Sequence, residues 1–171
     1  YFIDEGGFLS SMDQPAEVSV LEQGPLFVKV AVKGKIGKYS FTQTIRLTQG
    51  EPRIDMSVKL DWIGSPRIGE PGIEFRADNP RKAFYDDRYK LLVYLPTQIA
   101  NQQIYKDAPF DVCESRLENT FFNRWDSIKH NIILNWVDVA SKDNSCGLSL
   151  FTDHTTSYAH GKDFPLALNV Q

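Results

Sequence analysis

The chain has 171 residues, of which 42% are apolar and 24% charged, a composition typical of one folded domain and not of a disordered, fibrous or low-complexity segment. Its 19 basic and 22 acidic residues give a formal net charge of −3. The chain therefore lacks the basic excess that binds nucleic-acid phosphates or anionic membrane surfaces, and we expect neither partner.

The first third of the chain predicts a three-stranded antiparallel meander. Apolar and polar residues alternate strictly over 54–62, and the same alternation occurs over 39–47 and, more briefly, over 27–33. A period of two indicates strands with one buried and one solvated face, so we expect the apolar side chains to point inward. Turn-forming residues at 34–37 and 49–52 separate the three strands.

More strands are predicted in the second half. Residues 89–95 and 132–139 are almost continuously apolar, as expected of strands that are covered on both faces. Residues 147–151 and 166–170 follow as two further strands, with a polar loop over 152–163 between them. No window carries a sustained helical period. We therefore expect an all-β fold, an antiparallel sandwich or a barrel, in a single domain over residues 1–171.

The cysteines and histidines indicate no metal site in this chain. Cys113 and Cys146 are too few for a disulfide framework. We interpret them as two small buried hydrophobic residues, and one bridge in an oxidising compartment stays open. The three histidines, His130, His154 and His160, lack the close spacing that is usual among metal ligands.

No catalytic motif stands out either. There is no nucleophile elbow and no phosphate-binding glycine loop. Residues 83–89 interleave aromatic rings with charges, a mixture typical of sugar-binding surfaces and equally of a solvated turn anchored by a tyrosine. Asp86 and Asp87 are neighbours, but on a strand their side chains would point to opposite faces and would not form a pair of catalytic carboxylates.

Six segments, taken in order, resemble the C-terminal β-domain of glycoside hydrolase family 38 α-mannosidases. They cover most of the chain, from about residue 17 to its end. The segments are Val20-Leu-Glu-Gln-Gly-Pro25 with Val28-Lys-Val-Ala-Val32, Phe41-Thr-Gln-Thr-Ile45-Arg-Leu47 with the Gly50-x-Pro52-Arg-Ile-Asp55 turn, Tyr89-Lys-Leu-Leu-Val-Tyr-Leu-Pro96, Phe110-Asp-Val-Cys-Glu-Ser-Arg116, Asn135-Trp-Val-Asp-Val139, and Gly147-Leu-Ser-Leu-Phe-Thr-Asp153 followed by Tyr158 and Leu166-Ala-Leu168.

This resemblance implies a galactose-mutarotase-like supersandwich, present here as an incomplete fragment of a larger glycosidase. It also implies that the catalytic aspartate, the general acid and the zinc ion belong to an N-terminal catalytic domain of the same chain. We therefore expect no catalytic residue, no metal and no cofactor in these 171 residues, and no mannosidase activity from them alone. The expected partners are the catalytic domain, which this domain would brace, and mannose-containing glycans.

The residues that could reach a sugar are few. The best candidates in the loop over 83–89 are Tyr85, Asp87 and Arg88, and the resemblance adds Glu114 and Arg116 from its Glu-x-Arg segment. An arginine guanidinium offers planar donors that suit hydroxyl or carboxylate groups. Each of the five residues also has an ordinary structural interpretation, in a turn or in a surface ion pair.

Two other functions stay open at this point. The chain could be a free-standing carbohydrate-binding β-sandwich, which would use the same aromatic and polar residues without a catalytic partner. It could also be an extracellular interaction sandwich without a sugar role. An uncovered apolar face would favour the bracing domain of a larger enzyme. The two cysteines and the absence of an Asn-x-Ser/Thr sequon fit a bacterial cytoplasm or periplasm.

Overall fold

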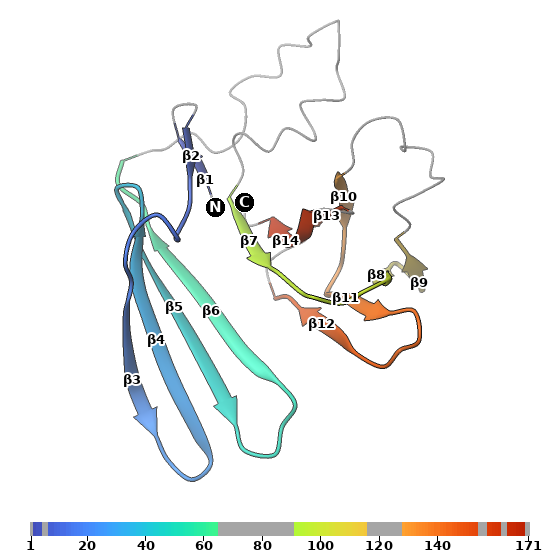
Figure 1. The fold of residues 1–171 in the computed structure, drawn as a ribbon, viewed down its shortest axis with the longest axis horizontal. Helices are drawn as coiled ribbons and strands as arrows, with labels where there is room; N and C mark the ends of the chain where they lie inside the picture. Colours follow the sequence, from blue (N-terminus) through green and yellow to red (C-terminus); the bar gives the residue numbers. More distant parts are fainter. Residues whose placement is uncertain are drawn as a thin grey trace, which may run out of the picture. The chain divides into compact units, whose positions relative to one another are not determined.

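A computed structural model describes the following residues: 2–4, 7–64, 91–115, 128–153, 157–161 and 164–169. Its regular elements over these residues are β-strands, and the strands pair in antiparallel sheets (Figure 1). The chain divides into two compact units, Tyr1–Glu74 and Phe75–Gln171. Each unit is described by itself.

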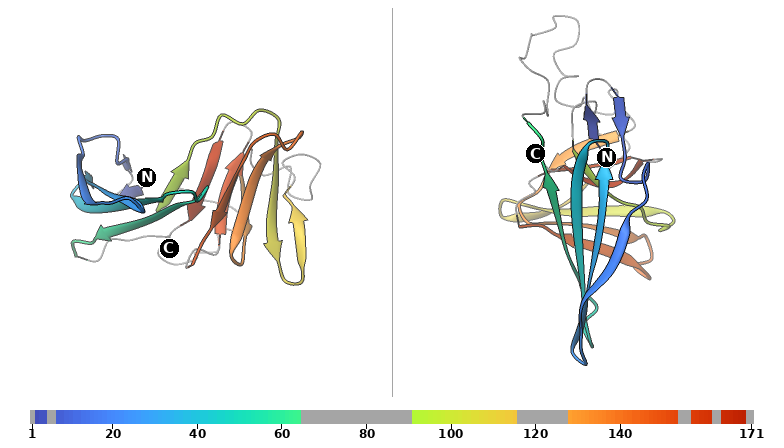
Figure 2. Two further views of the ribbon diagram at one scale, coloured as in Figure 1. Left: turned by 90° about the horizontal axis from the view of Figure 1, so that it is seen from below. Right: turned by 90° about the vertical axis from the view of Figure 1, so that its left-hand side faces the viewer.

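The first unit contains a hairpin and a four-stranded meander in the order β3-β4-β5-β6. Its strands are β1 (Phe2–Asp4), β2 (Gly7–Leu9), β3 (Glu17–Gln23), β4 (Phe27–Ile36), β5 (Tyr39–Thr48) and β6 (Ile54–Asp61). The predicted meander is confirmed as β4, β5 and β6, and β3 adds a strand that the alternation did not predict. The four strands lie side by side with the twist usual for such sheets (Figure 2).

The turn between β4 and β5 lies later than predicted. The two strands are paired up to Ile36 and Tyr39, so the loop consists of Gly37 and Lys38 alone, and Gly37 has a φ of 58°. Glycine at the first position of a two-residue loop is typical of hairpins. Gly34 is a strand residue instead, because it lies opposite Phe41, and an added Cβ there would stand 2.7 Å from the Phe41 ring.

The meander has one polar and one apolar face. Register and alternation place one set of side chains, which we call the apolar face, on the same side of the sheet. The apolar face consists of Val18, Val20, Gln23, Val28, Val30, Val32, Gly34, Ile36, Tyr39, Phe41, Gln43, Ile45, Leu47, Ile54, Met56, Val58 and Leu60. The opposite face carries lysine, arginine, aspartate, serine and threonine, as at Arg46, Asp55 and Ser57.

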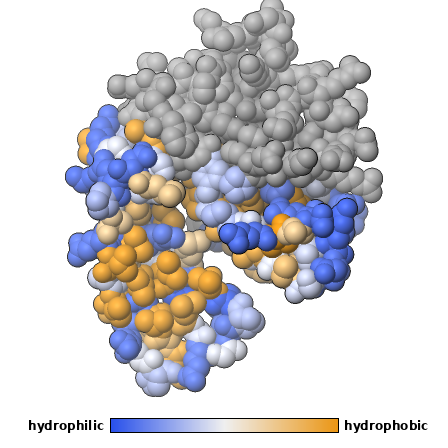
Figure 3. Space-filling view, in the orientation of Figure 1, coloured by the Kyte–Doolittle hydropathy of each residue, from blue (hydrophilic) through white to orange (hydrophobic). Residues whose placement is uncertain are grey.

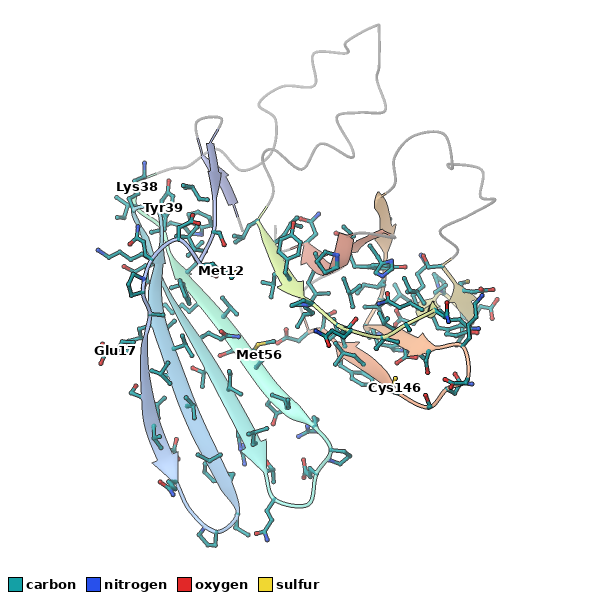
Figure 4. The ribbon with its side chains drawn as sticks, in the orientation of Figure 1. Met12, Glu17, Lys38, Tyr39, Met56 and Cys146 are labelled. Carbon is teal, nitrogen blue, oxygen red and sulfur yellow. The ribbon has the colours of Figure 1, made fainter. Side chains whose placement is uncertain are left out.

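The expected burial of the apolar face is confirmed at one end, where Tyr39 is 1% exposed and Phe41 8%, and is wrong over the rest of the face. Val20 is 60% exposed, Ile54 64% and Val58 48%. The apolar residues gather visibly over the meander in Figure 3, and the Met56 side chain projects from β6 in Figure 4. Alternation fixes which side chains share a face, but burial requires a second layer against that face.

The edge strand β3 is irregular. Val20 pairs with Val30 and Glu22 with Lys29, so Leu21 is an extra residue without a partner in the ladder. This is a β-bulge, which bends an edge strand and increases its local twist.

The second unit contains two four-stranded sheets, in the orders β10-β13-β14-β7 and β12-β11-β8-β9. Its strands are β7 (Leu92–Leu95), β8 (Gln102–Ala108), β9 (Asp111–Glu114), β10 (Ile128–Ile132), β11 (Trp136–Ser141), β12 (Gly147–Phe151), β13 (Ser157–Gly161) and β14 (Phe164–Asn169).

One core joins these two sheets. It combines residues from β8 and β11 of one sheet with residues from β13 and β14 of the other, together with Ile133. The core residues are Ile104, Ile133, Val137, Val139, Tyr158 and Leu166, each at most 3% exposed. Two antiparallel sheets that share a core form a sandwich, so the predicted fold class is confirmed.

Three predicted boundaries in this unit are wrong. Residues 132–139 are not one strand, because β10 ends at Ile132 and β11 begins at Trp136, with a turn between them. The predicted polar loop over 152–163 contains strand β13, whose residues Tyr158 and Ala159 are completely buried. The strand expected over 89–95 is shorter and begins at Leu92.

Candidate functional site

The structure describes one of the five predicted sugar-contact residues. Tyr85, Asp87, Arg88 and Arg116 lie outside the described residues. Glu114 is the last residue of β9 and is exposed. Its strand lies at the edge of the β12-β11-β8-β9 sheet, where Glu114 pairs with Tyr105 of β8.

Glu114 belongs to a surface that combines aromatic and polar side chains. Val137 and Val139 of β11 point into the core, so their strand neighbours Trp136 and Asp138 lie on the outer side of the same sheet. We call this outer surface the aromatic face. By register it consists of Gln103, Tyr105, Asp107, Val112, Glu114, Trp136, Asp138, Ala140, Gly147, Ser149 and Phe151.

The strand register arranges the aromatic face in rows. Glu114, Tyr105, Asp138 and Ser149 follow one another across the four strands. Trp136 lies directly opposite Phe151 in the next row. Opposite residues on one face have their Cβ atoms about 4.5–5.5 Å apart, so rings and carboxylates here are immediate neighbours. Phe151 is 76% exposed and Val112 57%.

Two hydrogen bonds fix polar groups of this surface. The Ser149 hydroxyl donates to Asp138 Oδ1 at 2.5 Å, between two adjacent strands. The Tyr105 hydroxyl donates to Gln103 Oε1 at 3.0 Å, along one strand. The partner of Asp138 is therefore on the neighbouring strand β12.

Asp107 positions the start of β11, and with it Trp136. Its Oδ1 accepts the backbone N–H groups of Leu134 at 2.9 Å and Trp136 at 3.3 Å. Its Oδ2 accepts the backbone N–H of Asn135 at 2.6 Å and the Asn135 side-chain amide at 3.0 Å. Lys106 Nζ donates to the Ile132 carbonyl at 2.8 Å. Two adjacent β8 residues thus hold the turn before β11.

The same hydrogen bonds determine the ionisation of Asp107. Burial raises the pKa of this carboxyl group, but the backbone N–H groups of Leu134, Trp136 and Asn135 lower it by more, so the net pKa is below its ordinary value. The side chain is therefore a carboxylate at neutral pH. It is buried, and its four hydrogen bonds compensate for that burial.

His160 connects the two sheets of the second unit. Its Nε2 lies 2.7 Å from Gln102 Oε1, between β13 of one sheet and β8 of the other. The amide oxygen is an acceptor, so the imidazole donates from Nε2. Burial lowers the pKa of His160 to about 4, which keeps the ring neutral at physiological pH.

The cysteines differ from expectation and do not pair. Both are free thiols, Cys113 half-buried and Cys146 exposed in the turn between β11 and β12 (Figure 4). The prediction that both are buried is wrong for Cys146. The turn is held by Asp143, which accepts the Ser141 hydroxyl at 2.6 Å and the Ser145 hydroxyl at 2.9 Å.

Over the described ranges, no group of three or more His, Cys, Asp or Glu side chains could hold a metal ion. Within the same ranges, no helix has the length and hydropathy needed to cross a membrane.

Sequence reasoning missed Tyr105, Phe151 and Trp136 as members of one surface. Each lies in a predicted or observed strand, but the surface exists only once β8, β11 and β12 are paired in register. The local signal was the alternation of core valines with Trp136 and Asp138 in β11.

Comparison with known proteins gave one match. A family model described as "Glycosyl hydrolases family 38 C-terminal domain" matches residues 5–169, nearly the whole chain. No curated protein and no solved structure matches.

Proposed function

Because the chain belongs to the C-terminal domains of family 38 glycosyl hydrolases, we propose that it is the bracing β-domain of a retaining α-mannosidase. Family membership makes it a non-catalytic domain of a family 38 glycosidase. The finer assignment adds three points: the substrate is an α-mannoside, the domain stabilises the catalytic domain, and it contributes residues to the rim of the sugar pocket.

The apolar face of the meander carries this proposal. A sheet with one mainly apolar face and a polar opposite face is built to be covered by another layer. Val20, Ile54 and Val58 are between 48% and 64% exposed. Contiguous exposed apolar surface of this kind marks a protein–protein contact. A catalytic domain in the same polypeptide supplies such a contact at high effective concentration.

The chemistry of the proposed enzyme lies in the catalytic domain. That domain would hold the catalytic aspartate, the general acid and the zinc ion. Tyr85, Asp87, Arg88, Glu114 and Arg116 remain proposed contributors to the pocket rim. Glu114 is the one among them that the structure describes, and it is exposed.

Substitutions on the two faces of β6 test the proposal in the enzyme that contains this chain. Val58→Asp places a carboxylate on the apolar face, where a covering domain would bury it without a partner at a cost of several kcal/mol. We expect the temperature of half-inactivation of α-mannosidase activity to fall by about 5 °C or more. Ser57→Asp, on the polar face of the same strand, is the matched control and should leave it unchanged.

The chain on its own provides the second arm of the experiment. Val58 is already about half exposed there, so Val58→Asp should change its free energy of unfolding by only about 0.5 kcal/mol. The isolated wild-type chain should not hydrolyse an aryl α-mannoside. Equal shifts from Val58→Asp and Ser57→Asp in the enzyme, or turnover by the isolated chain, would contradict the proposal.

A further inference from the structure

Strand β12 is an edge strand without the features that usually protect the edges of sheets. In the described part of the chain it pairs with β11 alone, in regular register over all five of its residues. Its sequence is Gly-Leu-Ser-Leu-Phe, without charge and without proline. Natural edge strands usually carry a charge, a proline or a bulge that hinders pairing with a further strand. The backbone groups of β12 that point away from β11 are therefore suited to pair with another strand.

The other edges of the three four-stranded sheets are better protected. Strand β3 carries the bulge at Leu21. Strands β6, β9 and β10 each contain at least two charged or ionisable side chains. Strand β7 is uncharged, but it has only four residues and Pro96 follows it directly. Among the edges that the structure describes, β12 is thus the one best suited to further pairing.

The sequence of β12 is complementary to itself when two copies run antiparallel. A two-fold axis at Ser149 would place Leu148 opposite Leu150 of the second copy, and Phe151 opposite Gly147. This register keeps the two faces of the sheet, because Leu148 and Leu150 lie opposite the core valines of β11 and the other two residues lie on the outer side. It pairs all five residues and brings no like charges together within the strand.

The exposed ring of Phe151 would gain a contact in this register. Phe151 is 76% exposed although Trp136 lies opposite it on β11. Gly147 has no side chain, so it leaves space above its strand for the ring of the second copy. An aromatic side chain beside a glycine on the neighbouring strand is an established way to cover that glycine. Because the axis is two-fold, the contact would occur twice.

The carboxylate of Asp138 does not oppose this pairing. It lies one strand further in, on β11, and accepts the Ser149 hydroxyl. Three strand spacings, about 14 Å, would separate the two copies of Asp138. That distance exceeds the Debye length of about 8 Å at physiological ionic strength, so their repulsion is largely screened.

We propose that two copies of the chain associate by antiparallel pairing of β12 with β12, centred on Ser149. The two β12-β11-β8-β9 sheets then form one continuous sheet. The contact is isologous, so it uses the edge of both copies and closes at a dimer. Its area is limited to one short strand and the neighbouring side chains, so the dimer is weak and forms at high protein concentration. The apolar face takes no part in it.

Disulfide trapping tests the register in the Val20→Lys chain, in which a lysine weakens association through the apolar face. In Ser149→Cys the two introduced thiols face each other across the axis, with about 5 Å between their Cβ atoms. We expect copper phenanthroline to convert this variant to a covalent dimer at least about tenfold faster than the chain without the new cysteine. Cys146 is the internal control, because it is exposed and its two copies would lie about 20 Å apart.

A second pair of variants, in the same Val20→Lys chain, tests the contact made by the ring. Phe151→Ser removes both symmetric contacts and should raise the dissociation constant of the dimer about tenfold, measured by sedimentation velocity over a concentration series. Phe110→Ser is the matched control and should leave the constant unchanged, because Phe110 is a fully exposed phenylalanine at the tip of the β8–β9 hairpin. Circular dichroism confirms that each variant is folded.

Three results would overturn the proposal. The first is equal rates of cross-linking with and without the cysteine at position 149. The second is equal weakening by Phe151→Ser and Phe110→Ser. The third is a Val20→Lys chain that stays monomeric up to about 1 mM, since association would then depend on the apolar face alone. None of these results bears on the bracing role, which the Val58→Asp enzyme tests separately.

Discussion

Asp107 shows how one side chain organises a segment that is distant in sequence. The carboxylate receives hydrogen bonds from three consecutive backbone N–H groups, at residues 134 to 136. These donors lie 27 to 29 positions further along the chain. The turn between β10 and β11 therefore depends on a residue of β8, and no local feature of the turn reveals it.

Replacing Asp107 by asparagine should destabilise the chain at neutral pH. One carboxylate oxygen becomes an amide donor that faces backbone donors, so buried N–H groups lose their acceptor. We expect Asp107→Asn to lower the free energy of unfolding by about 3 kcal/mol, measured by urea denaturation. Asp111→Asn is the control. Asp111 is exposed, and its carboxylate accepts a hydrogen bond from the neighbouring Val112 N–H. This substitution should lower the free energy of unfolding by only about 0.5 kcal/mol.

The difference in free energy of unfolding between wild type and Asp107→Asn should depend on pH in one direction. The folded pKa of Asp107 is below the ordinary value of 3.8, so its stabilising effect is complete well above pH 3.8 and is lost as the pH falls through the lowered folded value. The gap between wild type and Asp107→Asn should therefore narrow in acid. A gap that stays constant down to pH 2 would contradict this account.

Phe110 illustrates a conformation that sequence patterns miss. It occupies a two-residue loop with Pro109 and has a φ of 67°. Proline followed by a residue of positive φ is the geometry of a type II turn, in which the second position favours glycine or asparagine. A phenylalanine there gives no turn signal. The pairing of Ala108 with Asp111 nevertheless limits the loop to two residues.

At the scale of elements, the two sheets of the second unit are connected by a polar contact as well as by their core. His160 of β13 donates to Gln102 of β8, and Gln102 in turn donates from its amide to the Thr97 hydroxyl at 3.3 Å. The imidazole is 3% exposed. Its protonation would place a positive charge between the layers.

The stability of the sandwich should fall in mild acid because of His160. The folded pKa is about 4 and the ordinary value is 6.5, so between these limits the unfolded chain binds a proton that the folded chain does not. We expect the free energy of unfolding to decrease as the pH falls from 6.5 to 4. His160→Asn should remove that part of the slope, measured by urea denaturation at a series of pH values.

If His160→Asn does not fold, a second variant tests the same prediction. Gln102→Glu places a carboxylate 2.7 Å from the imidazole position, which favours the protonated ring and raises its pKa. The slope between pH 6.5 and 4 should then become shallower. A steeper slope in Gln102→Glu, or an unchanged slope in His160→Asn, would disprove the role of His160.

Sequence patterns predicted strands where the information is local. In β4, β5 and β6 nearly every second residue is apolar, and these strands formed as predicted. Burial was not predictable in the same way, since alternation does not tell whether a second layer covers a face, and Ile54 and Val58 are 64% and 48% exposed. The aromatic face depends on the register of β8, β11 and β12, which arises from pairing across the sheet, so its members could not be grouped from sequence alone.

At the scale of the whole molecule, an exposed apolar face on a chain of small net charge favours association. The net charge is −3 at pH 7 and the isoelectric point is near 5.6, where electrostatic repulsion between copies is weakest. We expect the isolated chain to self-associate, most strongly near pH 5.6, as measured by sedimentation velocity.

Variants on β3 assign the association to one face. Val20→Lys places a charge on the apolar face and should shift the population toward monomer, whereas Ser19→Lys adds the same charge on the polar face and should do so much less. An equal effect from both lysines would mean that net charge, and not the apolar face, governs association.

The bulge at Leu21 affects how a chain with an exposed apolar face can aggregate. A flat, regular outer strand rich in valine would offer its free backbone groups to copies of itself and would nucleate fibrils of the cross-β type. The extra residue interrupts that template and twists the rim of the sheet. The bulge thus hinders edge-to-edge growth into amyloid fibrils, while the exposed apolar face stays able to pack against another layer.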